Sequence, residues 1–128
     1  MKIMIVDDEQ DVEILFVQKF RKEIKSKQLE VEFAFSGEEA LKKLGDSGSP
    51  DVVYVFSDIN MPGMSGLELL ENIKAKFPKI EVSMISAYGD KENYTKAIKS
   101  GAKGFFTKPV DFDSLKHEIA ELLTKKLN

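Results

Sequence analysis

The segment VVYVFSD (Val52–Asp58) decides the fold, because it is an uninterrupted uncharged run that ends on a carboxylate. A continuous run, rather than an alternation of apolar and polar residues, is typical of a strand covered on both faces of a parallel sheet. Open α/β sheets place their ligands in the crevice beyond the carboxyl ends of the strands. We therefore expect Asp58 to lie in such a crevice, with the loop Ile59–Gly66 beside it.

Five strands alternate with five helical patterns along the chain. We expect the strands at Lys2–Val6, Val31–Phe35, Asp51–Ser57, Glu81–Ile85 and Gly104–Thr107. Glu32 makes the second strand suitable for a partly exposed sheet edge, whereas the other strands are continuously apolar. Strands that alternate with helices through right-handed crossovers predict an α/β fold of three layers, a doubly wound (βα)5 domain with a five-stranded parallel sheet.

Local patterns predict where helices begin and which residues they bury. Ser36–Glu39 and Ser65–Glu68 have the capping-box spacing, in which a serine and a glutamate satisfy backbone donors at a helix start. Asp111 is a favourable N-cap for the last helix, and Gly101 suits the left-handed residue after the fourth. The first helix carries an apolar stripe at helical spacing, made of Val12, Leu15, Phe16, Phe20 and Ile24.

Length and composition limit the possible classes of protein. With 128 residues and 42% hydrophobic content, we expect residues 1–128 to form a single domain around one core. The absence of cysteine excludes disulfides, thiolate metal sites and cysteine nucleophiles. No apolar run approaches the ~18 residues of a membrane helix, and no concentrated basic stripe favours direct nucleic-acid binding. We expect a soluble, cytoplasmic domain with no membrane partner.

Charged residues gather at three of the predicted strand ends. Asp7 and Asp8 follow the first strand, Asp58 follows the third and Lys108 follows the fifth. Clustered carboxylates repel one another, so they raise their own pKa values or recruit a cation. Oxygen ligands without histidine or cysteine favour Mg²⁺. With Mg²⁺ bound, a carboxylate can attack phosphorus, and Lys108 would supply a second positive charge.

The alternative for the first acidic pair is purely structural. Asp7 and Asp8 could simply begin the first helix, where the helix dipole favours carboxylates. The combination with Asp58 and Lys108 at other strand ends favours a functional site over this alternative.

Four motifs occur in a characteristic order and spacing. They are Val6-Asp7-Asp8-Glu9, the run from Ser57 to Gly66, Ile85-Ser86-Ala87 and Lys108-Pro109. Together they resemble the receiver domain of bacterial response regulators, the phosphoacceptor modules of two-component signalling that include the chemotaxis regulators. The resemblance extends from Lys2 to about Leu123 and implies the flavodoxin-like strand order 2-1-3-4-5.

The resemblance implies a phosphoacceptor and a set of metal ligands. Asp58 matches the position that accepts a phosphoryl group from a histidine kinase. Asp8 and Asp58 match side-chain ligands of Mg²⁺, and Asp7 matches a residue that contributes through water. Asn60 matches the position that offers its backbone carbonyl to the metal.

A switch is also implied by the resemblance. Ser86 matches the hydroxyl that binds a phosphoryl oxygen, and Lys108 matches the lysine that pairs with the phosphoryl group. The Lys108–Pro109 peptide is then expected to be cis. Phe105 stands at the aromatic switch position, where many relatives carry tyrosine. Because phenylalanine lacks the hydroxyl group, its ring cannot form the hydrogen bond that a tyrosine could. The alternative for Phe105 is an ordinary core residue.

Two residues near Asp58 are expected to tune rates. Tyr88 falls two positions beyond Ser86, and we expect its ring to hinder water that approaches the phosphorylated aspartate. Asn60 lies two residues after Asp58, where enzymes that use an aspartate nucleophile carry a carboxylic general acid. An amide cannot donate a proton in that way.

Two functions follow from these patterns. The first is a phosphorylation-controlled interaction module, which is not an enzyme and assists only its own phosphorylation and dephosphorylation. Its partners would be a histidine kinase or a histidine phosphotransfer protein, together with a downstream target or a fused output domain, and phosphorylation could drive homodimerisation. The second is a small Mg²⁺-dependent phosphatase-like enzyme with an aspartate nucleophile. Asn60, and the lack of an insertion long enough to form a cap, favour the first.

Overall fold

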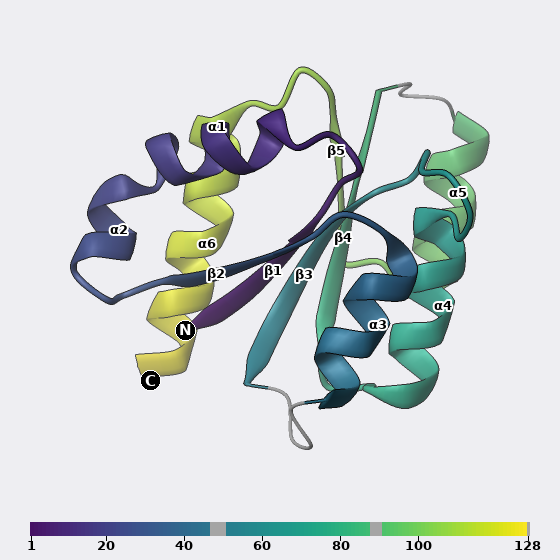
Figure 1. The fold of residues 1–128 in the computed structure, drawn as a ribbon, viewed down its shortest axis with the longest axis horizontal. Coiled ribbons are helices and arrows are strands. Elements are labelled where there is room, and N and C mark those ends of the chain that lie inside the picture. Colours follow the sequence, from purple (N-terminus) through teal and green to yellow (C-terminus); the bar gives the residue numbers. More distant parts are fainter. Residues whose placement is uncertain (47–50, 88–90, 128) are drawn as a thin grey trace.

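A five-stranded parallel sheet in the order β2-β1-β3-β4-β5 forms the centre of the computed structural model, which describes residues 1–46, 51–87 and 91–127 (Figure 1). The strands are β1 (Lys2–Val6), β2 (Glu30–Ala34), β3 (Val52–Asp58), β4 (Glu81–Ser86) and β5 (Gly104–Thr107). All five predicted strands and the predicted order are confirmed, with ends that shift by one residue in β2, β3 and β4. Within these ranges no helix is both long enough and apolar enough to cross a membrane.

Helices cover both faces of the sheet (Figure 1). They are α1 (Asp11–Lys19), α2 (Arg21–Lys25), α3 (Gly37–Asp46), α4 (Gly66–Lys76), α5 (Lys91–Lys99) and α6 (Phe112–Leu127). One apolar cluster joins the sheet to α3, α4 and α5, and a second joins its opposite face to α1 and α6. The predicted doubly wound fold of three layers is therefore confirmed.

Neighbouring residues of each central strand belong to opposite cores. In β1, Met4 packs in the cluster under α3–α5, whereas Ile3 and Ile5 pack in the cluster under α1 and α6. In β3, Val55 and Tyr54 divide in the same way. Because side chains of a strand alternate between faces, a strand covered twice needs apolar residues at every position. This explains why its sequence is continuous rather than alternating.

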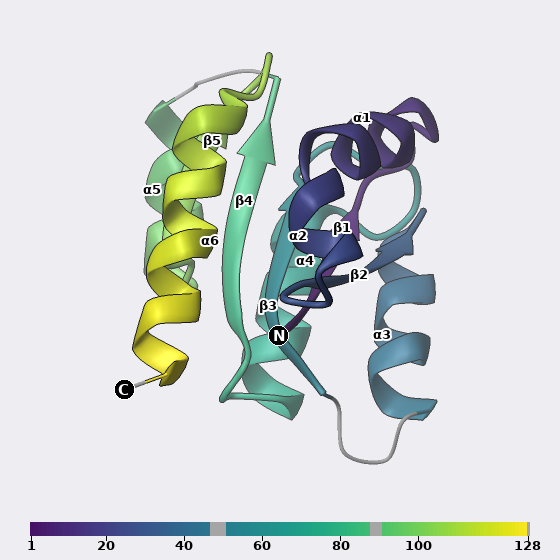
Figure 2. The ribbon, with the colours of Figure 1, turned by 90° about the vertical axis from the view of Figure 1, so that its left-hand side faces the viewer.

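The first helical pattern differs from the prediction. Phe20 leaves the helical region, with φ −106° and ψ 22°, and separates α1 from α2. Its ring is buried and stacks on Phe16 with 5.5 Å between centroids. Figure 2 shows α2 as a separate coil beside α1. Leu15, which the predicted stripe places in the core, is 44% exposed, because the inward face of α1 is centred on Phe16.

The predicted helix starts are present, with one change in detail. The Ser36 hydroxyl accepts a hydrogen bond from the Glu39 N–H at 3.0 Å, and Ser65 accepts one from Glu68 at 3.2 Å. The glutamate side chains do not return to the serine N–H: Glu39 accepts from the Phe35 N–H. At the other helices, Asp111 accepts bonds from the first turn of α6, and Gly101 has φ +101°.

A buried polar group ties α6 to the sheet. The hydroxyl of Tyr54, which is fully buried, is hydrogen-bonded to the Ser83 hydroxyl and donates to Glu118 Oε1 of α6 at 3.1 Å. Burial raises the pKa of the Tyr54 phenol, so the group stays neutral and keeps its proton. A Cβ on Gly104 would lie 2.8 Å from the Ser83 oxygen, which explains the glycine at the start of β5.

The outer edge of β2 carries a charged side chain. Lys43, one helical turn after Glu39 on α3, donates from Nζ to the Phe33 carbonyl at 2.6 Å. The same ammonium pairs with Glu39 at 3.1 Å. The carbonyl of Ala34, the next residue, points the other way and accepts a bond from the Asp7 N–H.

Gly66 fixes the junction between the end of β3 and α4. Its N–H donates to the Ile59 carbonyl at 2.8 Å, and a Cβ there would lie 2.0 Å from the Asp58 carbonyl oxygen. We therefore expect Gly66→Ala to lower the free energy of unfolding by about 3 kcal/mol, because backbone has to move to admit a methyl group. Urea unfolding measures this change.

Gly45 provides the matched control. It lies in α3, and a Cβ there would meet no atom within 4 Å. We expect Gly45→Ala to be neutral or to stabilise by up to about 1 kcal/mol, because alanine loses less backbone entropy in a helix. Equal effects of the two substitutions would contradict the steric account of Gly66.

Candidate functional site

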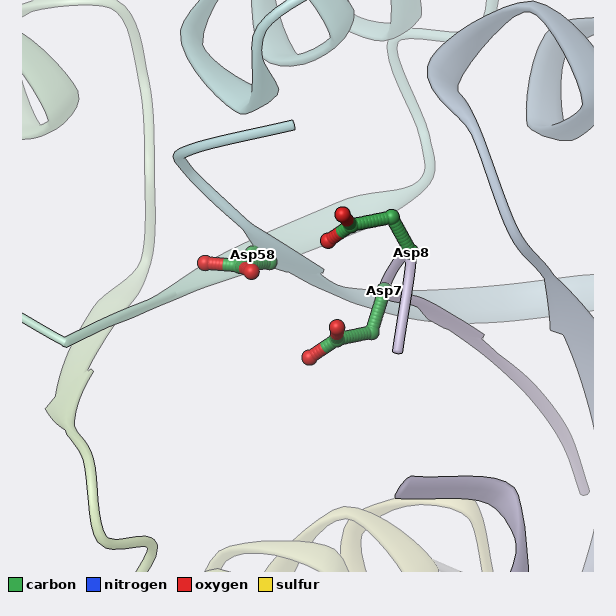
Figure 3. Close-up of side chains that lie close together, drawn as sticks. All are labelled: Asp7, Asp8 and Asp58. Carbon is green, nitrogen blue, oxygen red and sulfur yellow. The ribbon is translucent and has the colours of Figure 1, made fainter. Parts of the chain in front are cut away.

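Three carboxylates converge where β1 and β3 end. Asp7 and Asp8 directly follow β1, and Asp58 is the last residue of β3. One carboxylate oxygen from each of the three lies within 4.8 Å of the others (Figure 3). Asp7 and Asp58 are buried, whereas Asp8 is exposed. Three oxygen donors at this spacing, one of them facing solvent, fit a hard divalent cation such as Mg²⁺.

Asp7 and Asp8 do not serve the first helix. The N-cap residue of α1 is Gln10, so both aspartates precede the helix. Asp7 instead accepts a hydrogen bond from the Glu9 N–H at 2.9 Å with Oδ1 and leaves Oδ2 toward the site. The structural alternative for this acidic pair therefore loses its support.

Lys108 joins the two buried carboxylates. Its Nζ lies 3.0 Å from Asp7 Oδ2 and 3.2 Å from Asp58 Oδ2. Its backbone N–H donates to the Ser86 carbonyl at 2.7 Å, which anchors the end of β5 to the end of β4. The Lys108–Pro109 peptide is cis, which confirms the expectation from the sequence. One ammonium group thus contacts residues that are 101 and 50 positions away in the chain.

The electrostatics of the site follow from burial and proximity. Burial, followed by the negative charge of Asp7, raises the pKa of the Asp58 carboxyl above its ordinary value. Lys108 and a backbone hydrogen bond from Asn60 reduce this shift without cancelling it. Burial alone lowers the pKa of Lys108, but its hydrogen bond to Asp7 and the two carboxylate charges outweigh burial and leave that pKa raised. Lys108 therefore stays charged between its two partners.

The predicted switch residues occupy neighbouring strands. Ser86 is the last residue of β4 and is buried. Phe105, in β5, is half-buried and packs against the core under α3–α5. Its ring meets the exposed Tyr94 of α5 edge to face, with centroids 5.6 Å apart and planes at 73°. Tyr88 lies outside the described residues.

Two contacts near the site carry no signal in the sequence. In the first, Met64 donates its N–H to Glu38 Oε1 at 2.8 Å. Met64 lies on the loop that follows Asp58, which also carries the exposed Asn60. Glu38 belongs to α3, so it reaches the loop from another element. The Tyr94 contact with Phe105 is likewise invisible in the sequence, because both are common core-type residues.

The chain matches known proteins over almost its full length. The family model described as the response regulator receiver domain matches residues 3–120. The chemotaxis protein CheY of Listeria monocytogenes is 43% identical over 115 residues, which cover 88% of this chain and 90% of that protein. Sporulation initiation phosphotransferase F of Bacillus subtilis is 32% identical, with 99% and 97% covered.

Solved structures agree with the sequence matches. The crystal structure of a CheY-like response regulator receiver domain protein from Methanospirillum hungatei superposes with a TM-score of 0.83 at 29% identity. The superposition covers 97% of this chain and 94% of that one. The fold and the sequence thus lead to the same family.

The raised pKa of Asp58 predicts a pH-dependent stability. A group whose pKa is higher in the folded state binds its proton more tightly there, so its contribution is fully present below the unfolded pKa near 3.8 and is lost as pH rises through the folded pKa. We expect Asp58→Asn to unfold at a higher urea concentration than the parent at pH 7 without divalent cations. The difference should shrink toward pH 3.

Two controls accompany this measurement. Glu71→Gln removes an exposed carboxylate on α4 and should leave the pH profile unchanged. Added Mg²⁺ should stabilise the parent more than Asp58→Asn, because only the parent retains all three carboxylates. A variant that is less stable than the parent at pH 7 would contradict the raised pKa.

Proposed function

Because the chain belongs to the response regulator receiver domain family, we propose that it accepts a phosphoryl group on Asp58 from a histidine kinase or a histidine phosphotransfer protein. The observation that carries this proposal is the contact of Lys108 with both Asp7 and Asp58 at the strand ends. It brings a buried nucleophile, a second acid and a fixed positive charge into one site. We also propose that the protein meets its partners and reacts in the cytoplasm.

The transfer needs little chemistry from the protein beyond position and charge. A carboxylate oxygen of Asp58 attacks the phosphorus of a phosphohistidine, a P–O bond forms, and the P–N bond breaks with its electron pair left on the imidazole. Mg²⁺ would be held by Asp8, Asp58 and the Asn60 carbonyl, with Asp7 through water, and would offset charge on the phosphoryl oxygens. Lys108 supplies the second positive charge.

The phosphatase-like alternative lacks a proton donor at the required place. Asn60 stands two residues beyond the nucleophile, and its amide cannot act as a general acid. A site without that acid forms the acyl phosphate but does not speed its turnover in the same way. The proposed role is therefore that of a signalling phosphoacceptor.

A change of packing would carry the signal to a partner. We propose that Ser86 binds a phosphoryl oxygen and that Phe105 fills the space the serine vacates. The surface formed by α5, β5 and α6 would then differ between the two states and recruit a downstream target, a fused output domain or a second copy of the chain. Tyr94 and Ile98 are exposed on α5 and support this location, since apolar side chains in water mark contact surfaces.

The phosphodonor is proposed to approach over α1. Ile14, Leu15 and Val17 are 44–59% exposed on this helix. Leu15 also lines an apolar cavity of about 230 Å³ that has Asp7 and Lys108 in its wall. An apolar surface continuous with the site suits a protein that has to bring a phosphohistidine to Asp58.

Incubation with a small-molecule phosphodonor and Mg²⁺ tests the proposed function. We expect a base-labile phosphoryl group on the parent chain, and none on Asp58→Asn or after removal of Mg²⁺ with a chelator. Asp46→Asn, which changes an exposed carboxylate at the end of α3, is the control that should be labelled like the parent. Labelling that survives Asp58→Asn would overturn the assignment.

Lifetime of the phosphorylated form tests the role proposed for Tyr88. If its ring hinders attacking water, Tyr88→Ala should shorten the half-life about threefold, a change of roughly 0.7 kcal/mol in the barrier. Tyr88→Phe keeps the ring and should retain the parent half-life. An unchanged half-life in Tyr88→Ala would remove Tyr88 from the site.

A further inference from the structure

Two adjacent glutamates in the first turn of α3 have different partners. Glu39 serves its own helix: Oε2 accepts from the Phe35 N–H at 3.1 Å, and Oε1 pairs with Lys43 at 3.1 Å. These bonds lower the pKa of the Glu39 carboxyl. Glu38 instead points away from its helix and accepts the Met64 N–H at 2.8 Å, across 26 positions of sequence. One carboxylate of α3 therefore binds the backbone of the loop after β3.

That loop is held at both ends, and α3 adds a bond shortly before the second end. At one end, the Ile59 N–H donates to the Ile85 carbonyl at 3.1 Å. At the other end, the Gly66 N–H returns to the Ile59 carbonyl. Between these points, the Asn60 N–H bonds to the Asp58 carboxylate of β3, and the Met64 N–H bonds to Glu38 of α3. Ile59 and Met61 are buried in the core under α3–α5, so the Glu38 bond is the added support for the stretch of loop between Met61 and Gly66.

The packing around Glu38 shows how closely α3 and the loop fit. Gly63 has φ +74°, and a Cβ there would lie 3.2 Å from Glu38 Oε1. A Cβ on Gly37 would lie 2.9 Å from the Met64 sulfur. Glycine at position 63 leaves room for the Glu38 carboxylate, and glycine at position 37 leaves room for the Met64 side chain.

We propose that Glu38 is a positioning residue for the cation site: by holding Met64 it fixes the loop that carries Asn60 against Asp58. This inference rests on the proposed function, in which the Asn60 carbonyl is a metal ligand. Glu38 acts through the backbone of the loop. A loop that is already ordered loses less conformational entropy when the cation binds, so the cation is held more tightly.

The test compares four proteins: the parent, Glu38→Ala, Glu38→Gln and Glu39→Gln. The measured quantity is the Mg²⁺ dissociation constant, obtained by calorimetric titration. Glu38→Ala should weaken Mg²⁺ binding about threefold to tenfold, because the bond to Met64 is lost. Glu38→Gln should stay within about twofold of the parent, because the amide oxygen still accepts the bond although the charge is gone.

Amide exchange in the metal-free protein provides a second readout. We expect the Met64 N–H to exchange with solvent faster in Glu38→Ala than in the parent, and at the parent rate in Glu38→Gln. Glu39→Gln should lower the urea midpoint slightly, because the ion pair with Lys43 is lost, while leaving the Mg²⁺ constant and Met64 exchange unchanged. A general loss of stability would move all variants together and would not produce this pattern.

Two results would overturn the inference. One is a Mg²⁺ constant for Glu38→Ala equal to that of the parent, and the other is Glu38→Gln as weak as Glu38→Ala, which would indicate charge rather than position. Failure of the proposed function has a different signature, since the parent itself would then neither bind Mg²⁺ nor accept phosphate on Asp58. The inference falls with it in that case, and the parent data separate the two.

Discussion

One ammonium group between two buried carboxylates is the interaction on which the site depends. Asp7 and Asp58 are brought close because β1 and β3 are neighbours and end at the same edge of the sheet. Without Lys108 their charges would repel, and burial of both carboxylates reduces the screening of that repulsion by water. The lysine directly follows β5, two strands beyond β3, so the balance of charge holds only when β1, β3, β4 and β5 are paired. The neutralisation of the two carboxylates by Lys108 therefore depends on the pairing of these strands.

The strands and the loops position different parts of the site. Strands that are apolar on both faces place Asp58 and Ser86 with little freedom, since both strand ends are buried. The loop after Asp58 is held at Met64 by Glu38 and ends in a close backbone approach at Gly66. Rigid strands thus fix the reacting group, while adjustable contacts from helices place the backbone around it.

Much of this arrangement could be predicted from the sequence, for a physical reason. Strands buried on both faces have to be continuously apolar, and carboxyl ends of parallel strands have to meet, so Asp7, Asp58 and Lys108 could be brought together on paper. The break at Phe20 could not, because a buried aromatic fits a continuous helix equally well. Glu38 was also out of reach, because adjacent glutamates look alike until the loop is in place.

The lysine at the outer edge of β2 has a consequence for assembly. An edge strand normally offers a row of free carbonyl and N–H groups that can template a further strand. Here Lys43 occupies the Phe33 carbonyl and brings a charge to the middle of that row. An incoming strand would have to displace this ammonium group from its bond and from Glu39. Pairing of two copies edge to edge along β2 would therefore cost these bonds, which makes the β2 edge a poor place for a further strand.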